Sequence, residues 1–109
     1  MTYMAFLTKV IKTGIEAARE SYGEGSEKFR GSKDGFELCR NRNPPELLKA
    51  LKEANDDVQK AYWDDADNYW YWQCRQAEVE WVCNCVSAAL DSADQVPITA
   101  FTARGVMHA

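Results

Sequence analysis

The feature that most constrains this chain is a long stretch without proline or glycine, which runs over 47–93 directly after Asn43–Glu46. An asparagine can cap free helix amides, prolines fit a first helical turn, and a glutamate suits the positive end of a helix. At both ends of the stretch, from Leu51 and up to Ala89, apolar residues recur in alternating three- and four-residue steps. This spacing is typical of amphipathic helices, so the sequence predicts helical structure over 44–93 and an all-α fold.

The centre of this stretch breaks the apolar pattern, because the same spacing there selects Asp65, Asn68 and Arg75. Asp and Asn side chains compete with the backbone for hydrogen bonds and can start a new helix. One uninterrupted helix would be a rod of about 60–70 Å, which a domain this small has few ways to cover. We therefore favour a turn at 64–68, and a long antiparallel hairpin or coiled coil, over a single helix. The residues expected in its core or at an oligomer interface are Trp72, Val79, Val82 and Val86.

The remaining segments complete a small helical bundle in one domain spanning 1–109. Apolar residues at three- and four-residue steps predict a helix over 2–22. Four of the six glycines follow that helix, and their conformational freedom predicts a glycine-rich loop over 23–42. The sequence also predicts a short C-terminal segment over 98–107. That segment would pack on the bundle through Ile98, Phe101 and Val106.

The formal net charge of −4 is unevenly distributed along the chain. Residues 1–52 carry ten Lys and Arg against seven Asp and Glu, whereas 53–109 carry three against ten. Nucleic-acid-binding domains typically present net positive charge or a dense basic stripe, so direct nucleic-acid binding is disfavoured. No apolar run is long enough to cross a membrane, and the first residues lack the pattern of a secretory signal. We therefore expect a cytoplasmic protein that does not bind membranes.

The four cysteines, Cys39, Cys74, Cys83 and Cys85, do not have the CxxC spacing of a zinc site, and the one histidine is His108. Cys74 and Cys85 are eleven residues apart and share a helix face. This placement predicts buried free thiols rather than metal ligands.

The sequence offers no distinct catalytic constellation. The GxG at Gly23–Gly25 follows a helix instead of a strand, so it is not a dinucleotide-binding fingerprint. The pairs Asp64–Asp67 and Glu78–Glu80 could serve acid–base chemistry, but nothing distinguishes them from solvated helix residues. We expect no enzymatic activity and no cofactor.

A cluster of aromatic residues is the most informative part of the sequence for function. Successive members point in different directions around a helix, so one neighbouring element cannot bury them all. An exposed patch of this size is unusual for a monomer, which means that another segment, a second copy or a partner has to cover it. Flanking acidic residues would repel a phosphate chain and so disfavour base stacking. The cluster consists of Tyr62, Trp63, Tyr69, Trp70, Tyr71 and Trp72.

We expect a small acidic interaction protein, assembled as a homodimer, that binds and occludes another protein as an inhibitor or adaptor. A partner with a basic surface would complement the acidic half of the chain. One alternative is a nucleic-acid mimic whose carboxylates block an effector such as a nuclease, and a second is a structural homo-oligomer without a separate ligand. The basic residues Lys28, Arg30, Arg40 and Arg42 are the rival contact surface. The residues expected to contact the partner are Asp56, Asp57, Trp63, Asp64, Asp65, Asp67 and Trp70.

Overall fold

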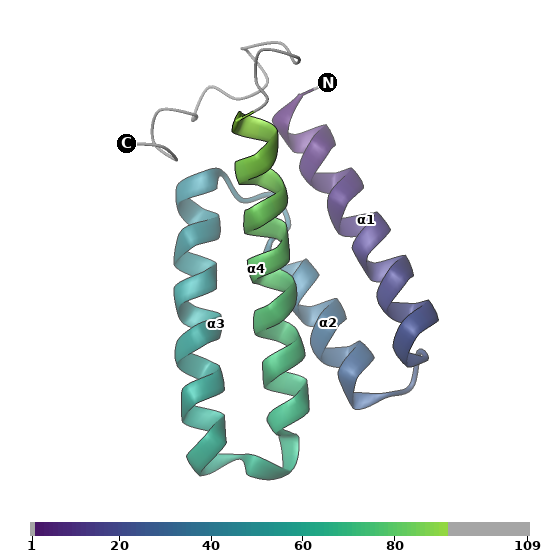
Figure 1. The fold of residues 1–109 in the computed structure, drawn as a ribbon, viewed down its shortest axis with the longest axis vertical. Helices are drawn as coiled ribbons and strands as arrows, with labels where there is room; N and C mark the ends of the chain where they lie inside the picture. Colours follow the sequence, from purple (N-terminus) through teal and green to yellow (C-terminus); the bar gives the residue numbers. More distant parts are fainter. Residues whose placement is uncertain (1, 92–109) are drawn as a thin grey trace.

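The computed structural model describes residues 2–91, which form four α-helices and one short 3-10 helix (Figure 1). No strand occurs among these residues. The all-α class predicted from the sequence is therefore confirmed. The C-terminal segment expected over 98–107 lies outside the described residues.

Helix α1 (Tyr3–Tyr22) agrees with the helix predicted over 2–22. The Thr2 side chain caps its start by accepting a hydrogen bond from the amide of Ala5, at 3.1 Å. The helix ends where Gly23 adopts a φ of 84°, a conformation that glycine reaches at little cost. Its buried face consists of Leu7, Ile11, Gly14 and Ala18.

Helix α2 (Glu27–Leu38) shows that the loop predicted over 23–42 is wrong for most of its length. Ser26 caps this helix by accepting a hydrogen bond from the amide of Phe29, at 3.1 Å. The two glycines within this helix, Gly31 and Gly35, permit close packing against another helix. A Cβ atom placed on Gly31 would lie 2.2 Å from the Tyr71 carbonyl oxygen, and one on Gly35 would lie 2.4 Å from that of Arg75. Both glycines therefore let α2 approach the backbone of α4.

The stretch predicted to be helical over 44–93 contains two helices. Helix α3 (Pro44–Asp64) begins with a capping box between Asn43 and Glu46, in which each side chain accepts the other's amide at 2.9 Å. Helix η1 (Ala66–Asn68) then turns the chain into helix α4 (Tyr69–Asp91). The helices α3 and α4 lie side by side and run in opposite directions (Figure 1).

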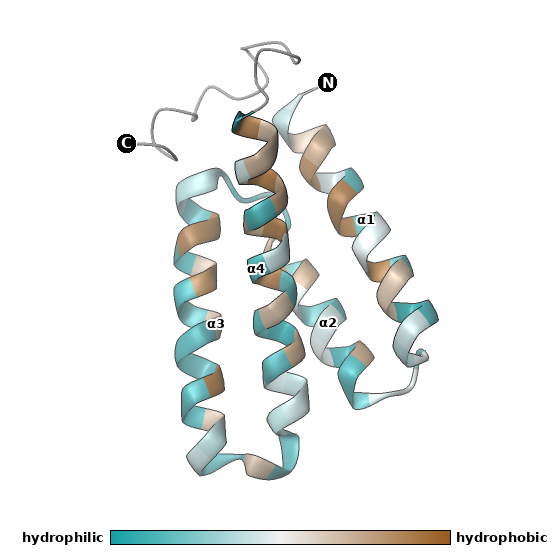
Figure 2. Ribbon diagram, in the orientation of Figure 1, coloured by the Kyte–Doolittle hydropathy of each residue, from teal (hydrophilic) through white to brown (hydrophobic). Residues whose placement is uncertain are grey.

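Helix α4 is the central element, because it packs against α1, α2 and α3 (Figure 1). Figure 2 shows that its upper half is hydrophobic, whereas its lower half is mostly hydrophilic or neutral. The core accordingly gathers around the upper half, where Val79, Val82, Val86 and Leu90 are fully buried. The other large side chains in this core are Leu7, Ile11, Phe29, Phe36 and Leu47.

The prediction that Cys74 and Cys85 are buried thiols is wrong, because both are only half-buried. Cys39 and Cys83 are the buried cysteines instead. Cys83 adjoins Val82 on the core face of α4, whereas Cys85 is rotated away from it by the helical period. Burial raises the pKa of Cys83 to about 11 and that of Cys39 to about 12.

The part of the chain that the structure describes contains neither a membrane-spanning helix nor a group of side chains suited to a metal ion. No helix there is long and apolar enough to cross a membrane. No group of three His, Cys, Asp or Glu side chains within 2–91 is arranged to hold a metal ion.

Candidate functional site

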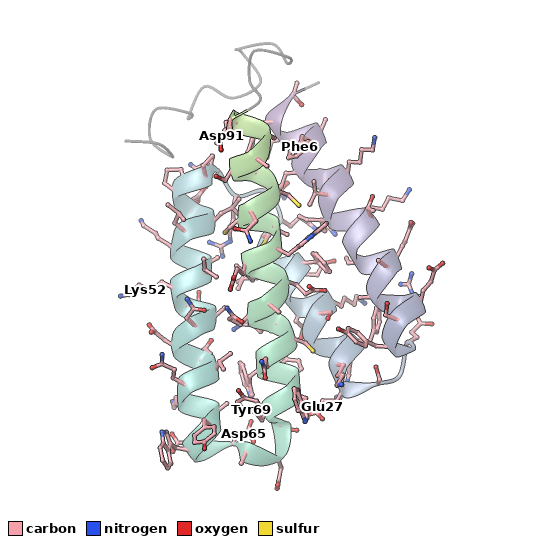
Figure 3. All side chains as sticks on the ribbon, viewed as in Figure 1. Phe6, Glu27, Lys52, Asp65, Tyr69 and Asp91 are labelled. Carbon is pink, nitrogen blue, oxygen red and sulfur yellow. The ribbon has the colours of Figure 1, made fainter. Side chains whose placement is uncertain are left out.

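The candidate site lies where α3, η1 and α4 meet, at the opposite end of the molecule from Asp91. Four rings gather there, and we call this cluster the aromatic end: Tyr62, Trp63, Tyr69 and Trp70. Figure 3 shows Tyr69 and Asp65 in this region, and shows Asp91 at the far end of α4. The rings pack edge to face in the order Trp63, Tyr62, Tyr69 and Trp70, with centroid separations of 5.0, 6.0 and 5.7 Å.

Three of the four rings of the aromatic end are exposed to solvent, and Tyr69 is half-buried. Trp63 is 82% exposed, Tyr62 is 60% exposed and Trp70 is 53% exposed. Trp63 and Tyr62 are adjacent near the end of α3, which ends at Asp64. The fold therefore presents a connected set of large rings that its described residues do not bury.

Helix α2 contributes a cation to this site. The Lys28 ammonium group lies 5.0 Å from the ring centroid of Trp70 and 6.0 Å from that of Tyr22. A cation over an aromatic face is attracted by the ring quadrupole. One face of Trp70 is therefore occupied by Lys28, whereas Trp63 has no such partner among the described residues.

A polar network beside the aromatic end explains why polar residues such as Asp65 and Arg75 interrupt the apolar pattern in the middle of 44–93. The Trp72 indole N–H donates to Asp65 Oδ2, and Arg75 donates to Asp57 Oδ2, both at 2.9 Å. The Arg75 guanidinium also lies 5.5 Å from the Trp72 ring centroid. These contacts join the lower halves of α3 and α4. The Trp72 hydrogen bond, followed by one from Asn68, lowers the pKa of Asp65.

This network contains three residues to which the sequence analysis gave other roles. Trp72 is not a core residue, because it is only half-buried and its N–H needs a polar partner. Contact of Asp57 and Asp65 with a partner stays a prediction, and within the chain their carboxylates accept hydrogen bonds from Arg75 and Trp72. The acidic residues that remain exposed around the aromatic end are Asp56, Asp64 and Asp67.

The basic residues of 28–42 do not form one surface patch. Lys28 lies at the start of α2, next to the aromatic end, whereas Arg40 and Arg42 lie just beyond its other end. Arg40 donates two hydrogen bonds to Glu37, at 2.8 and 2.9 Å. Lys28 and Arg30 of this set are placed to contribute to a partner surface at the aromatic end, since Arg30 lines a hollow with Asp65 and Asn68 next to η1.

The carboxylates considered for catalysis differ in their surroundings. Glu80 accepts a hydrogen bond from Gln76 at 2.8 Å, while Glu78 is half-buried between α1 and α4. Asp64 and Asp67 are both exposed. A comparison with protein-family models, with curated proteins and with solved structures finds no match for this chain. The exposed rings and their charged surroundings are therefore the strongest functional feature of residues 2–91.

Proposed function

We propose that this protein is an inhibitor or adaptor that binds another protein through the aromatic end and occludes the surface it binds. The observation that carries the proposal is the exposure of Trp63, at 82%, beside the exposed rings of Tyr62 and Trp70. Tryptophan and tyrosine are enriched among the residues that dominate binding energy at protein interfaces. Their burial on a partner would remove from water a surface that the described helices leave exposed.

The charges around the rings favour a partner with a basic surface. Asp56, Asp64 and Asp67 are exposed near the aromatic end and have no opposing side chain at salt-bridge distance among the described residues. Such charges raise the rate of encounter with a positive surface and disfavour acidic partners. The rings would then supply the lasting affinity, because the charges at the rim remain solvated.

The nucleic-acid mimic is a weaker alternative. A mimic needs a regular array of negative charges in place of phosphates, but the exposed face of α3 carries Lys49, Lys52 and Lys60 among its acids. Asp57 is also neutralised by Arg75. These features interrupt the acidic surface that such a mimic would present.

A second copy of the chain is the other occupant to be tested at the aromatic end. Two copies that bury Tyr62 and Trp63 against each other would make the homodimer expected from the sequence. Light scattering over a range of concentrations separates the two cases. A mass that stays at 12.4 kDa up to high concentration excludes self-association, and a mass that doubles favours it.

The proposal is tested by capture of binding proteins from the native host, followed by mass spectrometry. Trp63→Ala should lose the captured protein, because it removes the most exposed ring. Leu48→Ala is the matched control, since Leu48 is also an exposed apolar residue of α3, at 47%, but lies near the other end of that helix. A protein retained by wild type and Leu48→Ala but lost by Trp63→Ala supports the proposal. Equal capture by all three contradicts it.

A further inference from the structure

A second surface of the molecule is a groove between α1 and α4, which shares no residue with the aromatic end. Its upper part has a volume of about 600 Å³ and is lined by Phe6, Val10, Cys85 and Ala89 among others. Its lower part has a volume of about 270 Å³. Thr13 and Trp81 line both parts, so the two form one continuous surface. We call it the α1–α4 groove.

The two parts of the groove differ in chemistry. The upper part is lined mostly by apolar side chains, with Lys9 and Thr13 as its polar members. The lower part contains one carboxylate, Glu78, surrounded by the rings of Tyr22, Phe36 and Trp81. A half-buried carboxylate among aromatic rings is a favourable site for a guanidinium or ammonium group, because both the charge and the ring faces attract a cation.

A buried hydroxyl group next to this carboxylate also lacks a hydrogen-bond partner. Ser32 on α2 is only 1% exposed, and its Oγ has no hydrogen-bond partner of normal geometry. Burial raises the pKa of the Glu78 carboxyl, and the nearby Ser32 hydroxyl offsets only part of that rise. Glu78 is therefore held in a partly dehydrated position without a cation from the described residues, and a cation would stabilise its charged form.

The chain itself supplies a segment that matches both parts of the groove. Eighteen residues follow Asp91, and Arg104 is their one Lys or Arg. Ile98 and Phe101 precede it by six and three residues. The apolar residues thus come first along the chain and the cation second. The groove has the same order from the end of α4 downward, with the apolar part first and the Glu78 carboxylate second.

The distances allow this segment to reach the groove. Asp91 ends α4 at the same end of the molecule as Phe6, which lines the upper part (Figure 3). Between Ala89 and Glu78, α4 rises by about 16 Å at about 1.5 Å per residue. The six residue steps from Ile98 to Arg104 span about 9 Å in a helix and about 20 Å when extended. The groove therefore lies within the range of this segment.

We propose that residues 98–107 of the same chain bind in the α1–α4 groove, with Ile98 and Phe101 on its apolar upper part and the Arg104 guanidinium beside the Glu78 carboxylate. The groove is then a binding site for a short apolar segment that carries a cation. It is filled within one chain, and it is independent of a partner at the aromatic end.

Cys85 provides the first test, because it lines the groove and the segment would shield it. The alkylation rate of each cysteine is measured in the full chain by mass spectrometry, with the buried Cys39, which does not line the groove, as an internal reference. Phe101→Asp should raise the rate at Cys85 about tenfold or more while leaving Cys39 unchanged, as expected when the burial of one large ring is lost. Thr102→Asp is the matched control, since it adds the same charge to the same segment without removing a ring.

The ion pair provides the second test. Arg104→Glu and Glu78→Lys should each raise the alkylation rate at Cys85 several-fold, and the double variant, which restores opposite charges, should return it toward the wild-type value. The helical circular dichroism of each variant shows whether the described helices are retained. Recovery in the double variant also cannot arise from general unfolding.

The outcomes are distinct. Equal rates at Cys85 in wild type, Phe101→Asp and Thr102→Asp would overturn the proposal. Shielding that weakens on dilution would overturn binding within one chain and assign the groove to the segment of a second copy. Loss of a partner from the aromatic end leaves this test unaffected, because the reporter is a thiol in the groove.

Discussion

Substitution of Gly35 by alanine tests whether close approach of α2 to α4 is what holds the fold together. A Cβ atom at this position would lie 2.4 Å from the Arg75 carbonyl oxygen and 3.1 Å from its carbonyl carbon. The obstructing atoms belong to backbone, so no side-chain rotation can relieve the overlap. The two helices have to separate by about 1 Å, a gap at which dispersion contacts lose a quarter to a half of their energy.

The net cost follows from two opposing contributions. Overpacking of a tightly packed site typically costs about 1–3 kcal/mol, and a backbone obstacle places Gly35→Ala toward the upper end of that range. Alanine in a helix is favoured over glycine by about 1 kcal/mol. We therefore expect the free energy of unfolding to fall by about 2 kcal/mol. Gly31→Ala should behave similarly, because its Cβ would lie 2.2 Å from the Tyr71 carbonyl oxygen.

Urea unfolding followed by circular dichroism measures this loss. With a slope of about 1–3 kcal/mol per molar urea, a loss of about 2 kcal/mol moves the midpoint by about 1 M or more. The Gly31→Ala and Gly35→Ala double variant should lose less than the sum of the two, since the first substitution already separates the helices. Gly25→Ala is the control, because its Cβ would have no neighbour within 4 Å. If Gly35→Ala unfolds at the wild-type midpoint, the packing of α2 on α4 described above is wrong.

Two further predictions concern titrating groups in the core and in the polar network. Burial raises the pKa of Cys83 to about 11 and of Cys39 to about 12, so their contribution to stability is complete below about pH 9 and is lost as the pH rises toward those values. Thermal unfolding between pH 8 and pH 11 should show this loss, and a double Cys→Ala variant at these positions should show a smaller one, the remainder coming from tyrosines. Trp72→Phe removes an N–H donor to Asp65, so the pKa of Asp65 should rise toward its ordinary value, as followed by carbon NMR of the carboxylate. The stability that depends on ionised Asp65 is fully present above the ordinary pKa of an aspartate, and it is lost as the pH falls through the lowered pKa of Asp65 in the folded protein. If Asp65 titrates in Trp72→Phe as it does in wild type, the hydrogen bond from Trp72 does not form.

Much of the helical architecture could be predicted because its signals are local. The cap at Asn43 and the Asp- and Asn-rich turn before Tyr69 act through neighbouring residues, and the structure places helix boundaries at both. The valines at 79, 82 and 86 share one face of α4 through helical spacing alone. These features need no knowledge of which helix packs against which.

Helix α2 could not be recognised from its glycine content, because Gly31 and Gly35 are favourable only through their close contact with α4, which lies far along the sequence. In isolation, each glycine disfavours a helix by about 1 kcal/mol relative to alanine. The signal that could have revealed α2 is the three- and four-residue spacing of its buried positions, together with a capping serine before them. Those positions are Phe29, Ser32, Phe36 and Cys39.

The exposure of the aromatic cluster could be predicted from the sequence, but the contacts around it could not. The aromatic residues and their acidic neighbours were identified from the sequence, and Trp63 and Trp70 are exposed as a contact surface requires. The roles of Asp57 and Asp65 depend on Arg75 and Trp72, which face them only because the chain turns at η1. Such pairings arise from tertiary structure and leave no local trace in the sequence.

The measurement that tests the central claim most directly is the binding kinetics of the captured partner with variants of the aromatic end. Trp63→Ala should mainly accelerate dissociation and weaken binding by about 2 kcal/mol or more, because it removes an anchoring ring. Replacing Asp56, Asp64 and Asp67 by Asn should mainly slow association and flatten its dependence on salt, because exposed charges act over a Debye length of about 8 Å at physiological ionic strength. Unchanged rates in both variants, with binding abolished instead by substitution of Arg40 or Arg42, would contradict the account and place the contact surface at the other end of α2.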